Sequence, residues 1–215
     1  MGSDEGRRDM QLPDRDAAFD LYAAHAAAYD EDTDWAEGDR ARAVELLDLQ
    51  PGELVIDVGC GTGLCFARLR KAVGGSGRVL GVEQSVDMLE QAQARVRDAG
   101  WSNVDLILGS IEDVELPARA DAALFCFTHD VLRLPAAVES VVAHLRPGGR
   151  VAAVGPMWAP WWAPGMNLLI WYCTGPYVTT YEGFETPWSH LAAHVPGLVV
   201  ERHELSGLYF AWGTI

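Results

Sequence analysis

Three glycines at alternate positions, Gly59, Gly61 and Gly63, follow the apolar run VIDV. Such a stretch is a poor helix and a poor strand in its second half, so packing alone does not account for it. Glycine lets the backbone adopt positive φ and approach a ligand closely, and the helix expected next offers free N–H groups. Asp57 lies two residues before the first glycine. The loop therefore predicts a binding site for a nucleotide-like ligand.

The spacing of the glycines distinguishes among nucleotide ligands. The dinucleotide fingerprint G-x-G-x-x-G has its third glycine where this chain has Leu64, and the Lys-Ser/Thr pair of a P-loop is absent from the loop. Glu83 ends the next apolar run, where a carboxylate can accept hydrogen bonds from both hydroxyls of a ribose. The single lysine, Lys71, belongs to no Tyr-x-x-x-Lys relay, so a nicotinamide-dependent reductase is disfavoured.

A second group of polar residues follows the apolar run ADAALFCF at 120–127. His129 is the only histidine expected at the carboxyl end of a strand, and it would act as a base, orient an acceptor or cap the loop. Asp130 is the other catalytic candidate, although aspartate is also a good helix N-cap. His25 shares the first predicted helix with Tyr22 and Tyr29, and is a candidate for contacting the acceptor.

Residues 155–188 combine many aromatic side chains with prolines and glycines. These rings could wall a pocket for a flat apolar acceptor, surround a cationic amine, or pack the edge of a small domain. The prolines favour a shaped loop over a plain helix. We expect a largely apolar or aromatic acceptor pocket. Its candidate residues are Thr128, Trp158, Trp161, Trp162, Trp171, Tyr172 and Tyr177.

Strands and helices alternate through the chain and must position these groups. The predicted strands are 53–59, 78–83, 103–109, 120–127 and 148–155, followed by an antiparallel pair at 197–205 and 207–215. The predicted helices are 17–30, 39–49, 64–73, 85–100, 136–145 and 188–195. This alternation predicts an α/β fold with right-handed βαβ crossovers. We expect a Rossmann-like, doubly wound sheet of seven strands, mostly parallel with an antiparallel C-terminal strand, and helices on both faces.

The length of 215 residues favours one domain with a sizeable core. We expect a flexible acidic arm at 1–16 and a single domain at 17–215. Within it, 17–50 would form lid helices and 156–188 an aromatic insertion that recognises the acceptor.

The net charge of −15 argues against a nucleic-acid partner, because such proteins present a basic face. The first 39 residues hold twelve of the 31 acidic residues and three of the 16 basic ones, so much of the charge belongs to the N-terminal segment. No apolar run reaches the length of a membrane span, so no stable membrane insertion is expected. The four cysteines form no CxxC pair, which favours reduced thiols in the cytoplasm and no metal site.

The pattern D-x-G-x-G-x-G at 57–63, with Glu83 twenty positions after the last glycine, resembles class I S-adenosylmethionine-dependent methyltransferases. The resemblance covers about 17–155 and includes the acidic segment GSIEDVELP and the turn LRPGGRV. It implies S-adenosylmethionine as cofactor, with its ribose on Glu83. Where the family has an acid after the third strand this chain has Ser110, so Glu112 or Asp113 would take that contact. The other implied cofactor-binding residues are Tyr22, Tyr29, Asp57, Gly59, Cys60, Gly61, Gly63, Gln84, Met88, Ile111 and Phe127.

The resemblance implies in-line transfer of a methyl group to a small-molecule acceptor. The later half also looks like bacterial methyltransferases described as quinone or phospholipid-amine methylating enzymes. Its Arg- and Ala-rich composition resembles actinobacterial proteins, many of which tailor natural products, so an indole- or phenol-like intermediate is the favoured acceptor. A quinol or phospholipid-type amine is the alternative, and a non-catalytic S-adenosylmethionine binder is another. The attacked atom stays open, as does the choice between a monomer and a homodimer.

Overall fold

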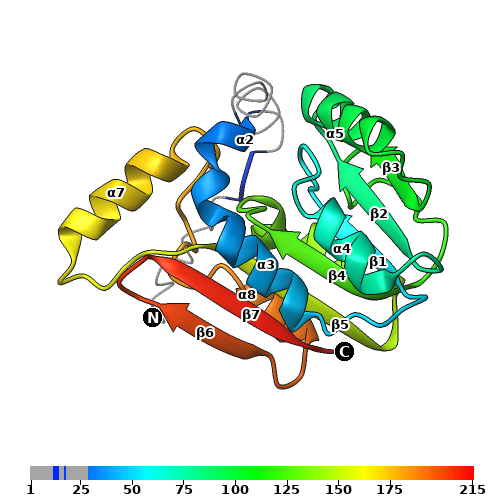
Figure 1. Cartoon of the computed structure of the whole chain (residues 1–215). Coiled ribbons are helices and arrows are strands. Elements are labelled where there is room, and N and C mark those ends of the chain that lie inside the picture. Colours follow the sequence, from blue (N-terminus) through cyan, green and yellow to red (C-terminus); the bar gives the residue numbers. More distant parts are fainter. Residues whose placement is uncertain (1–11, 15–16, 18–28) are drawn as a thin grey trace.

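The computed structural model describes residues 12–14, 17 and 29–215. They form a seven-stranded sheet in the order β3-β2-β1-β4-β5-β7-β6 (Figure 1). β7 is antiparallel to β5 and β6, whereas the first five strands pair in parallel. The strands are β1 (Leu54–Val58), β2 (Arg78–Glu83), β3 (Val104–Leu108), β4 (Ala120–Cys126), β5 (Leu145–Pro156), β6 (Val199–His203) and β7 (Leu208–Thr214). The predicted α/β fold is confirmed.

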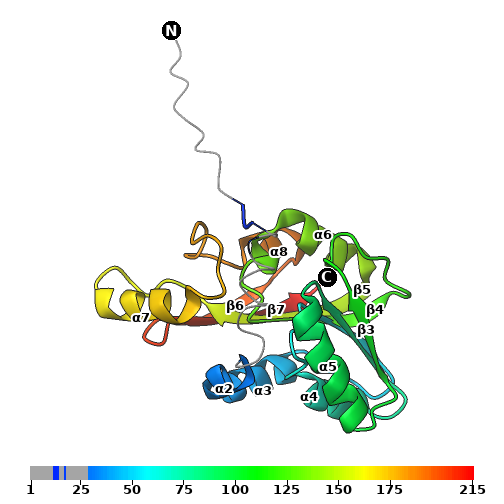
Figure 2. The same ribbon diagram turned by 90° about the horizontal axis from the view of Figure 1, so that it is seen from above.

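Helices cover both faces of this sheet: α3, α4 and α5 lie on one side, and α6 and α8 on the other (Figure 2). The α-helices are α2 (Tyr29–Asp32), α3 (Glu37–Leu46), α4 (Phe66–Val73), α5 (Val86–Asp98), α6 (Pro135–His144), α7 (Pro164–Thr174) and α8 (Ser189–His194). Two short 3₁₀ helices are η1 (Asp34–Ala36) and η2 (Val131–Arg133). The arm at 1–16 and the helix at 17–30 fall largely outside the described residues, and Tyr22 and His25 lie outside them entirely.

The strands β1, β2 and β4 are apolar and buried because side chains on both of their faces meet helices. On one face, Ile56 and Phe125 pack with α6 and with Leu191 of α8. On the other face, Val55 and Leu124 pack with apolar residues of α3, α4 and α5. The core therefore consists of two layers, one on each side of the sheet, and it fixes the carboxyl ends of β1, β2 and β4 at one edge.

The segment after β5 differs from its prediction, because Pro164–Thr174 form the regular helix α7 and not a shaped loop. Pro164 occupies the first turn, where its missing N–H costs no hydrogen bond, and Pro160 and Pro176 lie outside the helix. The prolines therefore delimit the helix without interrupting it. α7 extends beyond the edge of the sheet in both views (Figures 1 and 2).

The described chain contains no helix with the length and apolar character of a membrane span. All four cysteines are free thiols.

Candidate cofactor and acceptor sites

The first of two neighbouring cavities lies at the carboxyl ends of the central strands. β1 pairs with β2 on one side and with β4 on the other, so the order of the sheet reverses there. Open α/β sheets bind ligands at such a switch point. The predicted residues that line this cavity are Tyr29, Asp57, Gly59, Cys60, Gly61, Glu83, Gln84, Met88, Ser110, Ile111, Glu112, Phe127, Thr128 and Asp130.

The glycine loop forms the floor of this cavity, and Gly59 and Gly61 both have positive φ, 62° and 56°. A Cβ on Gly59 would lie 2.7 Å from Thr128 Cγ2, so a side chain there would collide with the segment after β4. A Cβ on Gly61 would meet no described atom within 4 Å. Gly63 does not line the cavity. A Cβ there would lie 2.4 Å from the Phe66 ring, which gives this glycine a packing role.

Two buried carboxyl groups face the cavity from β1 and β2. Glu83 accepts hydrogen bonds from the backbone N–H groups of Gly61 at 3.0 Å and Ser85 at 2.8 Å. Burial raises the pKa of Glu83, and its backbone hydrogen bonds oppose that shift. Asp57 has one oxygen, Oδ2, with no hydrogen-bond partner among the described residues. Burial, and to a lesser extent Glu83, raise the pKa of Asp57 to about 8. The site therefore holds a protonated carboxyl group at neutral pH.

The wall beyond Glu83 carries a different set of side chains. Ser110 donates a hydrogen bond of 3.0 Å to Gln84, which joins the residues that follow β2 and β3. Met88 and Ile111 are buried apolar residues beside them. A planar base would find apolar side chains and amide groups here.

The helix α2 is tied to the glycine loop, and this tie places Tyr29 over the cavity. Asp30 accepts a hydrogen bond of 2.6 Å from the Thr62 hydroxyl and pairs with Arg95 of α5. Arg95 also donates to the Thr62 carbonyl at 2.8 Å. Tyr29 therefore reaches the first cavity from a segment that lies far from the loop in sequence, and its role as a lid residue stays a prediction.

The second cavity is the larger, about 630 Å³ against about 80 Å³. Its wall is mainly apolar and joins α2, η1, α7, the loop after α7 and the start of β7. The predicted residues that line it are Tyr29, Phe127, His129, Tyr172 and Tyr177. The residues that sequence reasoning missed include Trp35, Met166, Leu169, Ile170 and Leu208.

Tyr29, Arg40 and Phe127 line both cavities and so mark the passage between them. Phe127 follows β4 with a φ of 57°, a conformation that side-chain-bearing residues rarely adopt and that is often found at functional sites. Arg40 is 4% exposed and donates a hydrogen bond of 2.7 Å to Thr33. Arg40 was not among the residues predicted from the sequence. The sequence did contain one indication that its side chain is buried, because its guanidinium lies on the same helix face as the apolar residues three, four and seven positions later.

His129 faces the second cavity and not the first. Burial lowers its pKa to about 3, and the nearby Arg133 guanidinium contributes to that shift. The ring packs edge-on against Phe127 and Phe184, with centroid distances of 6.2 and 6.5 Å. The imidazole is therefore neutral at physiological pH and suited to hydrogen bonding with an acceptor. A residue with so low a pKa is a weak general base.

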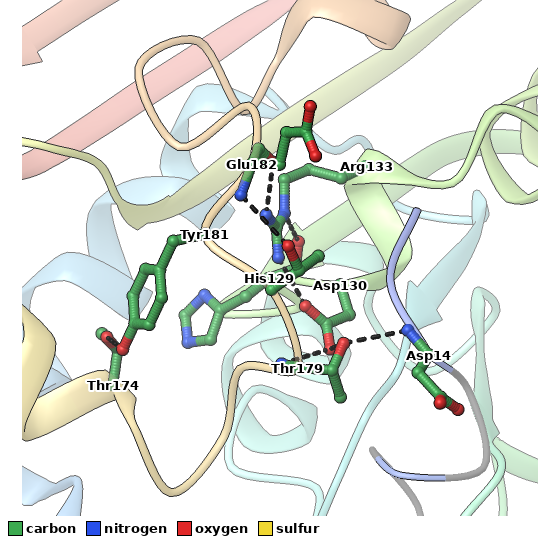
Figure 3. Close-up of polar contacts among 9 residues, drawn as sticks. Asp14, His129, Asp130, Arg133, Thr174, Thr179, Tyr181 and Glu182 are labelled. Carbon is green, nitrogen blue, oxygen red and sulfur yellow. Dashed lines mark hydrogen bonds and ion pairs between the residues drawn. The ribbon is translucent and has the colours of Figure 1, made fainter. Parts of the chain in front are cut away.

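Asp130 is engaged in a buried network, which Figure 3 draws together with His129. Its carboxylate pairs with Arg133 at 2.5 Å and accepts two hydrogen bonds from Thr179. It makes no side-chain cap to η2, the helix that it precedes. The hydrogen bonds occupy both carboxylate oxygens, which leaves Asp130 poorly placed to take a proton from an acceptor.

The predicted tryptophans line neither of these two cavities. Trp158 stacks on Tyr181 at a centroid distance of 5.0 Å and packs against Phe184, within a small separate cluster. Trp161, Trp162 and Trp171 are exposed. The helix α7 directs Ile170 and Thr174 inward and leaves Trp171 on its outer side. Because a loop was predicted for this segment, these inner and outer faces were not predicted.

Comparisons with known proteins agree with this geometry. Residues 55–149 match the family described as Methyltransferase domain. Aklanonic acid methyltransferase DauC of Streptomyces sp. (strain C5) is 32% identical over 119 residues, covering 54% of this chain and 54% of that protein. Nocamycin O-methyltransferase of Saccharothrix syringae is 32% identical over 127 residues, covering 55% of this chain and 43% of that protein.

A solved structure extends the likeness to nearly the whole chain. The crystal structure of a SAM-dependent methyltransferase from Aquifex aeolicus superimposes with a TM-score of 0.66 and 20% identity, over 90% of this chain and 98% of that one. At that identity the match shows the fold. The chain spans about a third to about half of the length of the curated relatives that it matches first.

Proposed function

We propose that this chain, whose residues 55–149 match the methyltransferase domain family, is a class I S-adenosylmethionine-dependent methyltransferase and that it methylates a small, largely apolar acceptor such as a phenol or an indole. The observation that carries the proposal is the pair of cavities that meet at Tyr29, Arg40 and Phe127. The cavity at the glycine loop would hold the cofactor, and the larger apolar cavity would hold the acceptor. The methyl group would then pass between them at the shared residues.

The residues of the first cavity fit S-adenosylmethionine. The unpartnered oxygen of Asp57 would accept a hydrogen bond from the methionine ammonium group, and the buried Arg40 guanidinium would bind its carboxylate. Glu83 would hold the ribose hydroxyls, and the adenine would lie among Gln84, Met88, Ser110 and Ile111. When bound, the cofactor supplies a methyl group on a sulfonium, which is already activated for displacement.

The protein would then mainly align the acceptor and exclude water. The apolar wall of the second cavity would desolvate an aromatic ring, and His129 would orient its polar atom by a hydrogen bond. Among the described residues that line this cavity, the acidic one is Asp32 of α2, and it is exposed. This described lining therefore offers no buried carboxylate as a partner for an amine. This supports an uncharged acceptor over a cationic one.

Methyl transfer from isotopically labelled S-adenosylmethionine to a panel of phenols, indoles, quinols and amines tests the proposal. We expect S-adenosylhomocysteine and a labelled phenol or indole, identified by mass spectrometry. A product only from quinols or amines would replace the favoured acceptor by the alternative. Binding of the cofactor without turnover on any acceptor would favour a non-catalytic binder.

The remaining expectations about partners stay predictions. They are a cytoplasmic protein, no nucleic-acid partner, and a monomer or homodimer.

A further inference from the structure

We propose that Asp130 and Thr179 form a junction that ties the N-terminal segment at the cofactor cavity to the wall of the acceptor cavity, so that filling one orders the other. This inference rests on the proposed function. In this proposal Asp130 and Thr179 position other groups. The anionic side chain of Asp130 lies beside the reaction site but transfers no proton. Figure 3 shows the contacts.

The fixed end of the junction is the ion pair between Asp130 and Arg133. The two side chains are 8% and 4% exposed, and their nitrogen and oxygen atoms lie 2.5 Å apart. Arg133 also donates to the His129 carbonyl at 3.0 Å and to the Glu182 carbonyl at 2.7 Å. One guanidinium therefore holds the segment after β4 and the loop after α7 together. Buried, charge-assisted hydrogen bonds of this kind are strong and geometrically specific.

Thr179 is the point where a third segment joins. Its backbone N–H and its hydroxyl donate to Asp130 Oδ2, at 3.0 and 2.7 Å. The same hydroxyl accepts a hydrogen bond of 3.0 Å from the backbone N–H of Asp14. The hydroxyl group thus links the carboxylate on one side to the N-terminal segment on the other.

The N-terminal segment 12–14 contributes one residue, Pro13, to the lining of the cofactor cavity. Pro13 lines that cavity together with the glycine loop, although the two lie far apart in the sequence. In this proposal an adenosyl ligand fills the cavity of about 80 Å³ and contacts the segment that carries Pro13. Because the backbone N–H of Asp14 is bonded to Thr179, a movement of this segment would break that bond or carry Thr179 with it.

The loop after α7 carries the other half of the coupling. Tyr177 lines the acceptor cavity, and its ring meets Tyr29 edge-on at a centroid distance of 5.6 Å. Between Tyr177 and Thr179 lies Val178, which is buried in the small apolar cluster. Only one residue therefore separates the junction from the acceptor wall, and in this proposal a shift of Thr179 is passed to Tyr177.

The test compares Thr179→Val with Thr179→Ser in the full chain. Valine removes the hydroxyl while keeping the shape and the backbone hydrogen bond, whereas serine restores the hydroxyl. Thr214→Val, an exposed site at the end of β7, is the matched control. The readouts are the dissociation rate of S-adenosylhomocysteine and amide hydrogen exchange of residues 177–182, with and without that ligand.

We expect Thr179→Val to release S-adenosylhomocysteine about fivefold faster, the effect of losing the neutral hydrogen bond that the Asp14 N–H donates to the Thr179 hydroxyl. The ligand should slow exchange at 177–182 in the wild type, Thr179→Ser and Thr214→Val, and no longer do so in Thr179→Val. Equal dissociation rates and equal protection in Thr179→Val and the wild type would overturn the junction. Failure of the wild type itself to bind the ligand would instead overturn the proposed function.

Asp130→Asn provides an independent arm, because it keeps the shape of the side chain while removing its charge. It should reproduce the loss of ligand-dependent protection seen in Thr179→Val. Retained protection in Asp130→Asn, with an unchanged dissociation rate, would contradict the anchoring role of the ion pair. Because Thr179→Val leaves that ion pair intact, the proposal stays testable even if Asp130→Asn does not fold.

Discussion

Asp57 shows how one side chain can report on ligand binding. Its carboxyl group has a pKa of about 8, because it is buried and lies near Glu83, so it is largely protonated at pH 7 in the unliganded chain. A ligand ammonium group beside it favours the ionised form. We therefore predict that S-adenosylhomocysteine binding at pH 7 releases close to one proton.

Calorimetry in phosphate and in Tris measures this release, since the two buffers differ in their enthalpy of ionisation. The apparent binding enthalpy should differ between the buffers for the wild type and should be nearly the same in both for Asp57→Asn. Identical wild-type enthalpies would show that Asp57 does not change its protonation on binding.

His129 gives a second prediction at this scale. Because burial and Arg133 lower its pKa to about 3, the ring stays neutral from pH 5 to pH 8. Its NMR resonances should not titrate in that range, and turnover should show no inflection near pH 6.5. His129→Asn, which keeps a hydrogen-bonding group, should retain more activity than His129→Ala. A pKa between 6 and 7, matched by an inflection in turnover, would restore the role of base.

The glycine loop is the element whose geometry the account depends on most. Gly59→Ala meets two penalties, a positive φ and a Cβ contact of 2.7 Å with Thr128, whereas Gly100→Ala, at φ 64°, meets only the first. The φ penalty is about 1–2 kcal/mol at either position, and overpacking adds about 1 kcal/mol or more at Gly59. Urea unfolding should show this difference, and only Gly59→Ala should weaken S-adenosylhomocysteine binding.

Equal loss of stability and of ligand affinity in the two variants would mean that the contact between Gly59 and Thr128 has no special importance.

The bounds of a helix or strand were predictable where a single local feature of the sequence sets them. β2 was predicted with its observed bounds because an apolar run ends at an acidic residue, and the helix over 85–100 was predicted with its stop at Gly100. The structure adds that Ser85 caps this helix. The helix α7 was missed because its prolines were interpreted as breaks, although they lie at its ends. Asp130 was predicted as catalytic because it follows His129 at the end of a strand. Its contact with Thr179, 49 positions away, is one that no sequence pattern reveals.

At the scale of the whole molecule, stability should fall as pH rises through neutrality. The pKa of Asp57 is raised from about 3.8 to about 8, so the folded chain holds a proton that the unfolded chain has lost, and this contribution disappears as pH rises through 8. His129 acts oppositely, because its lowered pKa contributes stability that is lost below pH 6.5. Above pH 6.5 the effect of Asp57 is therefore unopposed by His129.

Between pH 6.5 and 8 the free energy of unfolding of the unliganded chain should fall by about 1 kcal/mol per pH unit. Urea unfolding at several pH values measures this slope, and Asp57→Asn should flatten it. A wild-type stability that rises over this range would contradict the assigned protonation of Asp57.

The two cavities differ in how far the sequence could predict them. The cofactor cavity was predictable because most of its residues lie in loops that directly follow consecutive strands. The acceptor cavity was not, because Trp35, Ile170 and Leu208 meet only after η1, α7 and β7 have packed together. Arg40 and Phe127 connect the two cavities, and only the folded chain shows that they do.

The most direct test of the central claim is a calorimetric titration of the wild type and Glu83→Ala with S-adenosylhomocysteine, with NADPH as the control ligand. The account predicts micromolar binding of S-adenosylhomocysteine to the wild type, binding at least about tenfold weaker to Glu83→Ala because the ribose contact is lost, and no binding of NADPH. Absence of binding to the wild type, or an affinity unchanged by Glu83→Ala, would contradict the assignment of the cofactor site.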